Sequence, residues 1–163
     1  MAKNKGEKTN VMRVLEQKKI AYTPHSYPHE EGIAVDGVTV AKSMGFDPAI
    51  VFKTLVARGA SKQYYVFDVP VAENLDLKKA AKAVGEKSIE MIHQKELLPL
   101  TGYVHGGCSP VGMKKLFPTV IDASAENLET MIVSAGKIGY QVELAPHDLA
   151  ALVRAKFADI IVE

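Results

Sequence analysis

The stretch Tyr103–Lys115, YVHGGCSPVGMKK, holds the side chains most easily imagined as nucleophiles. Cys108 is the only cysteine of the chain, and His105 lies three residues before it. Such a pair is catalytic when the thiol pKa is lowered and a third group orients the base, and the sequence shows neither. Ser109 is followed by Pro110 and lacks the G-x-S-x-G spacing of a nucleophile elbow. An unreactive cysteine is therefore the preferred interpretation, and serine hydrolysis is not predicted.

Two adjacent glycines, Gly106 and Gly107, offer a different chemistry in the same stretch. Glycine permits backbone conformations closed to other residues, so successive N–H groups could face an anionic or carbonyl oxygen. No Walker lysine-serine pair follows, which argues against a nucleoside triphosphate site. A structural turn would explain the glycines about as well. The second glycine-rich loop, residues 134–139 (SAGKIG), is slightly better explained as a plain hairpin with Lys137 in solvent.

Lys53 is unusual because it lies inside the strand-like segment 50–57, IVFKTLVA. Side chains alternate along a strand, so Lys53 shares its face with the apolar Val51 and Leu55. A lysine whose stem covers apolar surface while its ammonium reaches solvent is the simpler explanation. The alternative is a lysine held in a pocket, where it could contact a phosphate or a developing negative charge.

Other candidate chemistry is weaker. His25 and His29 are four residues apart, but Pro24 and Pro28 exclude the helix that would place them on one face. A metal site there is therefore not expected. No pair of carboxylates stands out as an acid–base couple.

The composition indicates one domain without a global affinity for nucleic acid. The chain has 163 residues, 47% of them hydrophobic, and 20 basic against 19 acidic side chains. A formal charge of +1 gives no excess of positive charge for extended contact with a phosphate backbone. One cysteine makes no internal disulfide, so a cytoplasmic setting is the default expectation. The polar N-terminus predicts no signal peptide, no segment reads as membrane-spanning, and residues 1–8 are expected to be mobile.

The elements that must position these residues follow from periodicity and from capping and turn residues. Thr9, Asp36 and Asp76 are predicted N-caps, and Gly45 and Gly85 are predicted helix ends. Helices are expected after Thr9 to about residue 17 and at 38–44, 77–84, 93–98 and 146–155. Strands are expected at 50–57, 63–71, 118–124, 130–136, 140–145 and 158–163, with a short one after residue 21.

Strands and helices interleave without strict βαβ alternation, and hairpin signals dominate. The class predicted is α+β, with a single mixed, mostly antiparallel sheet or barrel-like core flanked by helices. The site must then lie on this sheet and its loops.

Five segments of the chain resemble one family: VFKTLV, NLDLKKAAKAVG, GYVHGGCSPVGMKK, MIVSAGKIGYQVELAPHDL and FADIIVE. Together they are similar to the YbaK type of aminoacyl-tRNA deacylase, relatives of the editing domain inserted in bacterial prolyl-tRNA synthetases. The resemblance extends from about Val11 to the C-terminus. It is more specific than any single motif, because all five occur in order and at matching spacing. It implies one editing domain over residues 1–163.

The resemblance implies release of a wrongly attached amino acid from tRNA, most often cysteine from Cys-tRNA(Pro) or Cys-tRNA(Cys), without a metal or other cofactor. It identifies Lys53 as the residue on which catalysis depends. The substrate-binding residues that it implies are Tyr27, Thr54, Gly106, Gly107, Ser109, Ser134 and Gly136. Deacylation of another small amino acid, such as alanine, and a non-catalytic nucleotide- or tRNA-binding module are the alternatives.

The chain departs from the family pattern at Asp36, where relatives carry a phenylalanine in a loop expected to border the amino-acid pocket. The departure leaves the identity of the amino acid open. The partners implied are the acceptor end of a charged tRNA and prolyl-tRNA synthetase, with no membrane and no DNA. Breaking the aminoacyl ester needs a cationic contact, hydrogen-bond donors and a small pocket, which Lys53 and the two glycine loops could supply.

Overall fold

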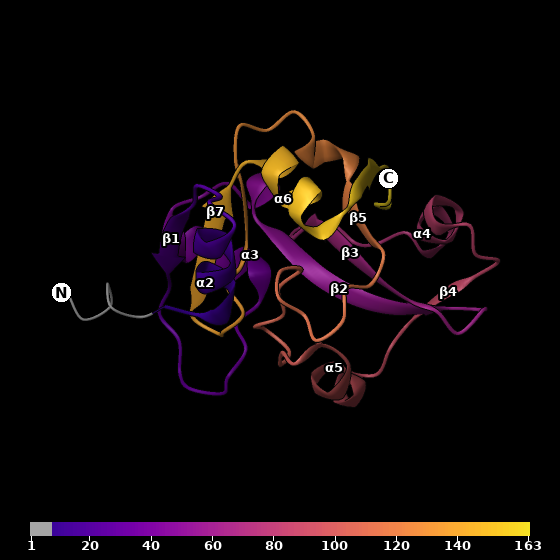
Figure 1. Cartoon of the computed structure of the whole chain (residues 1–163), viewed down its shortest axis with the longest axis horizontal. Coiled ribbons are helices and arrows are strands. Elements are labelled where there is room, and N and C mark those ends of the chain that lie inside the picture. The colour runs from indigo at the N-terminus through magenta and orange to yellow at the C-terminus, as the bar shows by residue number, and fades with distance from the viewer. Residues whose placement is uncertain (1–7) are drawn as a thin grey trace.

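The computed structural model describes residues 8–163, which form helices packed on two β-sheets (Figure 1). The expected mobile segment 1–8 lies outside the described residues except for Lys8, whose ammonium pairs with Glu16. The α-helices are α2 (Asn10–Gln17), α3 (Gly37–Met44), α4 (Leu77–Val84), α5 (Gln94–Thr101) and α6 (Pro146–Val153), and the 3₁₀ helices are η1 (Pro48–Ile50) and η2 (Ala123–Ala125). The strands are β1 (Thr23–Ser26), β2 (Phe52–Gly59), β3 (Tyr64–Pro70), β4 (Ile89–Met91), β5 (Thr119–Asp122), β6 (Met131–Ser134), β7 (Tyr140–Leu144) and β8 (Lys156–Ala158). None of these helices is long and apolar enough to cross a bilayer.

The helix boundaries follow the capping residues. Thr9, Asp36 and Asp76 accept hydrogen bonds from backbone N–H groups in the first turns of α2, α3 and α4. Gly45 and Gly85 end α3 and α4 with φ values of 80° and 75°, where a side chain would be strained. The predicted starts of these three helices and the predicted ends of α3 and α4 are therefore confirmed.

The strands form two sheets instead of the single sheet that was expected. One sheet has the order β1-β7-β6 and is antiparallel throughout. The other has the order β4-β2-β3-β5-β8, antiparallel from β4 to β3 and parallel from β3 to β8. The prediction of a mixed, mostly antiparallel arrangement in an α+β fold is confirmed. The number of sheets could not be read from the segments, because it depends on which strands pair.

Strand β2 belongs to the larger sheet, and the residue before it links that sheet to the smaller one. It forms the β2–β3 hairpin and also pairs with β4, and in Figure 1 it crosses the middle of the molecule, from the side of α3 and β7 toward β4. Just before it, Val51 forms a parallel bridge with Ile132 of β6, and its carbonyl accepts the Val71 N–H at 2.8 Å. The beginning of β2 therefore lies where both sheets meet.

The main hydrophobic core lies between the two sheets. Helix α2 contributes Val11, Met12 and Leu15, all buried. They pack in one cluster with residues from both sheets, including Val56, Val66, Val133 and Val142. The apolar face of α2 therefore holds the two sheets together from one side.

The prediction of a last strand at residues 158–163 was wrong in position. The strand is Lys156–Ala158, parallel to β5. Beyond it, the backbone N–H of Ile160 donates to Asp122 Oδ1 at 3.1 Å, and the Ile160 carbonyl accepts the N–H of Asp76 at 2.8 Å. Ile161 forms an isolated antiparallel bridge with Leu75, so this segment pairs with the residues before α4 and does not extend the β5–β8 ladder.

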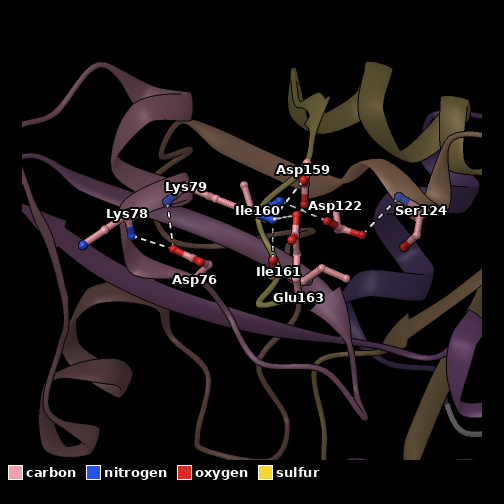
Figure 2. A network of polar contacts seen from close by, with 9 residues as sticks. All are labelled: Asp76, Lys78, Lys79, Asp122, Ser124, Asp159, Ile160, Ile161 and Glu163. Carbon is pink, nitrogen blue, oxygen red and sulfur yellow. Dashed lines mark hydrogen bonds and ion pairs between the residues drawn. The ribbon is translucent and has the colours of Figure 1, made fainter.

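A polar network fixes this C-terminal segment (Figure 2). Asp122 is 2% exposed, and its Oδ2 accepts the N–H of Ser124 at 3.1 Å while its Oδ1 accepts that of Ile160. Lys79 of α4 reaches over the same segment and donates to Asp159 Oδ2 and to the carbonyl of Ile161. The buried carboxylate of Asp122 is thus fully used by backbone donors.

Replacing Asp122 by alanine should lower the free energy of unfolding by about 2–3 kcal/mol, because two backbone N–H groups lose a charged acceptor. Urea denaturation of the purified variant measures this change. Asp159→Ala is the control: its ion pair with Lys79 is exposed, so little change is expected. Equal stability of the two variants would contradict the role assigned to Asp122.

Candidate functional site

A cavity of about 300 Å³ opens where the two sheets meet. Its walls come from the beginning of β2, the first turn of α3 and the loop before it, the end of β6, strand β7 and residues 105–108. Of the sequence-predicted site residues, the structure brings five to this cavity: Tyr27, Lys53, Thr54, Gly106 and Ser134. Gly107, Ser109 and Gly136 do not line it.

Lys53 lies on the predicted face of β2. Phe52 and Val56 pack into the main apolar cluster, whereas Val51 and Leu55 pack into two other clusters. The two sets of side chains therefore lie on opposite faces, and Lys53 shares the face of Val51 and Leu55. The Lys53 side chain is half-buried, and burial lowers the pKa of its ammonium, while the charge of Glu73 opposes that shift. Within residues 8–163 the ammonium makes no hydrogen bond or ion pair, so it can contact an anionic group that enters the cavity.

Thr54, the next residue along, points to the other face of β2. Its hydroxyl donates a hydrogen bond of 2.6 Å to Oδ1 of Asp68, the residue opposite it on β3. Asp68 is completely buried, and its Oδ2 has no hydrogen-bond partner among the described residues. Burial raises the pKa of Asp68 to about 7, although the bond from Thr54 acts in the opposite direction. The wall of the cavity therefore includes a hydroxyl coupled to a buried carboxyl group.

Cys108 lines the cavity but is poorly suited to act as a nucleophile. It is 8% exposed, and burial, together with the nearby Asp68, raises the pKa of its thiol to about 12. His105 also lines the cavity, but no hydrogen bond between the two side chains is recorded. Reactive cysteines need a lowered pKa, so the interpretation of Cys108 as an unreactive residue is supported.

The two adjacent glycines have different surroundings. A Cβ at Gly106 would lie 2.7 Å from Cβ of Ala34, and the φ of Gly106 is 89°. Gly107 donates its N–H to the carbonyl of Val104 at 3.0 Å, and a Cβ there would lie 3.1 Å from the backbone N of Ile138. Gly106 therefore lets residues 105–108 approach the loop before α3, and Gly107 serves a turn that packs on the second glycine loop.

Ser109 is turned into the protein. It is completely buried, and its hydroxyl accepts the N–H of Val111 at 3.2 Å. Tyr103 closes the same turn by donating from its hydroxyl to the Val111 carbonyl at 2.6 Å. The serine therefore shapes the loop from behind and has no direct access to the cavity.

The second glycine loop contributes one residue to the cavity. Ser134 lines it, and its hydroxyl accepts the N–H of Gly136 at 3.1 Å. A Cβ at Gly136 would lie 2.9 Å from the Tyr103 ring, so this glycine allows close packing on the core. The loop joins the β6–β7 hairpin and Lys137 is exposed, as predicted, with its ammonium 5.4 Å from the centre of the Tyr140 ring.

Asp36 and Tyr27 border the cavity from the side of the smaller sheet. Asp36 caps α3 by accepting hydrogen bonds from Thr39, and these bonds lower the pKa of its carboxyl group. Tyr27 is 5% exposed, and burial raises the pKa of its phenol. The loop that departs from the family pattern thus borders the cavity, as expected, with its carboxylate already engaged by the helix.

The sequence interpretation missed two polar residues of this region. Asp68 follows Phe67 in the otherwise apolar strand YYVFDVP, where a lone carboxylate among apolar residues was a signal of the same kind as Lys53. Gln141 lines the cavity, is 7% exposed, and its Oε1 has no hydrogen-bond partner among the described residues. No pattern in the sequence singled out Gln141.

Metal ligation is not apparent in the described part of the chain. No group of three or more histidine, cysteine, aspartate or glutamate side chains in residues 8–163 is placed to hold a metal ion. His25 instead contacts Glu143 at 2.8 Å, and His29 contacts the carbonyl of Tyr27 at 2.9 Å. The arrangement offers a cation, a hydroxyl–carboxyl pair and an amide around a small cavity with apolar walls.

Known proteins share this sequence and this fold. Residues 34–152 match the aminoacyl-tRNA editing domain family. A protein of Enterococcus faecalis named "Putative Cys-tRNA(Pro)/Cys-tRNA(Cys) deacylase EbsC" is 45% identical over 161 residues, covering 98% of both chains.

Solved structures agree with this assignment. One described as "a putative trans-editing enzyme for prolyl tRNA synthetase" is 25% identical, covers 94% of this chain and 95% of its own, and has a TM-score of 0.79. The hypothetical protein APE2540 is 19% identical, covers 93% and 99% of the two chains, and has a TM-score of 0.82, which shows the shared fold. The chain belongs to the aminoacyl-tRNA editing domain family.

Proposed function

We propose that this protein is a deacylase that releases cysteine from mischarged tRNA in the cytoplasm, with Cys-tRNA(Pro) as the main substrate and Cys-tRNA(Cys) as a second one. The observation that carries the proposal is the position of Lys53, whose unpaired ammonium borders a small cavity at the junction of two sheets. The relative at 45% identity is named for this activity, and it matches nearly the whole chain.

The size and walls of the cavity suit the aminoacyl group of a small amino acid. Its volume of about 300 Å³ is at the lower end of the range for ligand sites. Val40, Val51 and Val71 give it apolar walls. A buried acceptor such as Gln141 Oε1, which lacks a partner, suits the α-ammonium group of the amino acid. We assign Tyr27, Thr54, Gly106 and Ser134 to substrate binding beside it.

The reaction needs no protein nucleophile. Water, or the thiol of the attached cysteine, bonds to the ester carbonyl carbon, and the bond from that carbon to the ribose oxygen breaks. The proton of the nucleophile ends on the ribose oxygen. Lys53 is positioned to stabilise the negative charge that develops on the carbonyl oxygen, or to hold the phosphate of the terminal adenosine. The catalyst then supplies mainly position and electrostatics.

Gly107, Ser109 and Gly136 act differently in this proposal. Gly107 and Ser109 use their polar groups within their own loop, and Gly136 packs on the core. We assign them to the shape of the two glycine loops, with Gly106 and Ser134 as the residues that face the substrate.

Recognition of the tRNA body is proposed to depend on a partner. The formal charge of +1 gives little general attraction to a polyanion. A complex with prolyl-tRNA synthetase would present the charged acceptor end at high effective concentration. The deacylase itself then needs to recognise little more than the terminal aminoacyl-adenosine.

Lys53→Ala should leave the fold intact and lower kcat/KM for Cys-tRNA(Pro) by a factor on the order of a hundred, because the developing charge loses its cation. Release of radiolabelled cysteine measures the activity, and circular dichroism verifies the fold. Lys78→Ala, at an exposed lysine of α4, is the matched control and should be fully active. Full activity of Lys53→Ala would refute the role given to Lys53.

Cys108→Ala tests the alternative of a cysteine hydrolase. With a thiol pKa raised to about 12, Cys108 is not a thiolate at neutral pH, so the variant should keep most of its deacylase activity. Its free energy of unfolding should fall by about 1 kcal/mol, since a buried sulfur is lost. Complete inactivity of a correctly folded Cys108→Ala would restore the nucleophile interpretation.

A panel of tRNA(Pro) charged with cysteine, alanine or serine tests the substrate. We expect cysteine to be released roughly tenfold or more faster than alanine or serine, since the three side chains differ by only one group. Adding prolyl-tRNA synthetase should lower the KM. Equal rates of release for the three amino acids would refute the assignment of cysteine as the preferred substrate. Measurable binding of tRNA without release of any of them would favour a non-catalytic module.

A further inference from the structure

Asp68 is a buried carboxyl group that accepts a hydrogen bond from a side chain at one oxygen only. The contrast with Asp122 on the neighbouring strand β5 makes this clear. Both are almost inaccessible, at 0% and 2% exposed. Asp122 uses each of its oxygens to accept a backbone N–H, as Figure 2 shows. Asp68 accepts one bond, from a side chain, and its second oxygen has no partner among residues 8–163. A buried carboxyl with half of its capacity unused is costly, which suggests a role outside folding.

The one contact of Asp68 leads to the cavity. Thr54 stands opposite it in the β2–β3 register, lines the cavity, and donates its hydroxyl proton to Asp68 Oδ1 at 2.6 Å. A hydroxyl has one proton and two lone pairs. While that proton points to Asp68, the lone pairs of Thr54 Oγ1 are available to a donor in the cavity.

The surroundings of Asp68 place its pKa near neutral pH. None of the ion pairs among residues 8–163 includes Asp68. Thr54 of β2 donates a hydrogen bond to Asp68, and the thiol of Cys108 lies close enough for the charge of Asp68 to raise its pKa. Cys108 is a neutral thiol at pH 7, since its pKa is raised to about 12. Lys53 lies on the opposite face of β2 from Thr54. Burial accordingly raises the pKa of Asp68 to about 7.

We propose that Thr54 and Asp68 form a proton-accepting pair for the deacylation reaction, in which Thr54 Oγ1 contacts the nucleophile and Asp68 is the positioning residue behind it. The inference rests on the function proposed above and adds to it the group that activates the nucleophile. Lys53 lines the same cavity and keeps its role toward the carbonyl oxygen or the phosphate.

The proton transfers balance without any further reactant. As the oxygen of water or the sulfur of the substrate thiol bonds to the carbonyl carbon, its proton passes to Thr54 Oγ1. The hydroxyl proton of Thr54 passes at the same time to Asp68 Oδ1. When the bond between the carbonyl carbon and the ribose oxygen breaks, the proton returns through Thr54 to that oxygen. The pair ends in its initial state.

Asp68→Asn separates proton acceptance from position. The asparagine carbonyl oxygen can still accept the bond from Thr54, but it cannot take up a proton at neutral pH. We expect kcat for Cys-tRNA(Pro) to fall by a factor on the order of a hundred, with little change in KM. Thr54→Val should show a similar loss, and the double variant should lose no more than either single variant.

The pH profile is the readout that a purely structural role would not change. After subtraction of the uncatalysed rate, kcat of the wild type should rise with pH through about 7 as Asp68 ionises, and kcat of Asp68→Asn should lack this rise. Asp122→Asn is the matched control. It should be less stable than the wild type, because Asp122 is bonded by two N–H donors, yet keep the wild-type pH profile.

The free energy of unfolding, measured against pH, tests whether Asp68→Asn folds and whether Asp68 is buried in the wild type. The folded pKa of about 7 lies above the ordinary value of 3.8, so the folded state holds its proton more tightly than the unfolded chain does. The stability of the wild type relative to Asp68→Asn should therefore fall as pH rises from about 4 to about 7. Thr54→Val provides the kinetic test should Asp68→Asn fail to fold.

The outcomes separate this inference from the proposed function. If the wild type releases cysteine while Asp68→Asn or Thr54→Val keeps wild-type kcat and pH profile, the proton-accepting pair is refuted and the deacylase assignment stands. If the wild type releases no amino acid from any charged tRNA, the assignment itself fails, and the inference fails with it. The proton-accepting pair is supported if Asp68→Asn loses kcat and the pH-dependent rise while Asp122→Asn keeps both.

Discussion

The arrangement of the site depends on the link between the two sheets at the beginning of β2. Strand β2 pairs with β3 and β4, and the residue before it bridges β6 of the smaller sheet. The cavity forms beside this bridge, where the two sheets meet. Because successive side chains of a strand point in opposite directions, two neighbouring residues of β2 present a cation and a hydroxyl on its two faces. Pairing along β2 therefore fixes the relative positions of the reactive groups without requiring a flexible loop to do so.

Much of the local structure could be predicted from the sequence, because it depends on neighbours in the chain. The caps at Asp36 and Asp76 bond to their own helices, so their effect is visible within a few residues. The same locality explains the β2–β3 hairpin. For the candidate site, the pattern singled out Lys53 as a charge between two apolar strand neighbours but favoured a lysine that reaches solvent, and only the resemblance assigned it to a site. The division of the strands into two sheets could not be predicted from the sequence, because it depends on pairing between segments that are distant in the chain.

The polar part of the site depends on which atoms remain unpaired, and sequence does not contain that information. Ser109 and Asp68 are both fully buried. The Ser109 hydroxyl accepts a backbone N–H, whereas Oδ2 of Asp68 has no hydrogen-bond partner among the described residues. From the sequence, Ser109 looked more reactive than Asp68. The shift of the last strand from residues 158–163 to Lys156–Ala158 has a similar origin, since Asp122, a residue far away in sequence, binds the backbone at Ile160.

The C-terminal segment has a consequence for how the chain folds as it is synthesised. Strand β8 completes the larger sheet beside β5, and Ile160 closes onto Asp76 and Asp122, which precede it by many residues. Contacts between such distant segments form slowly and only when both are available. The hairpin of β2 and β3 can form early on the ribosome, whereas the larger sheet closes only after its last strand has emerged. Until then β5 exposes an unpaired edge, which is the stage at which the nascent chain is most open to association with other chains.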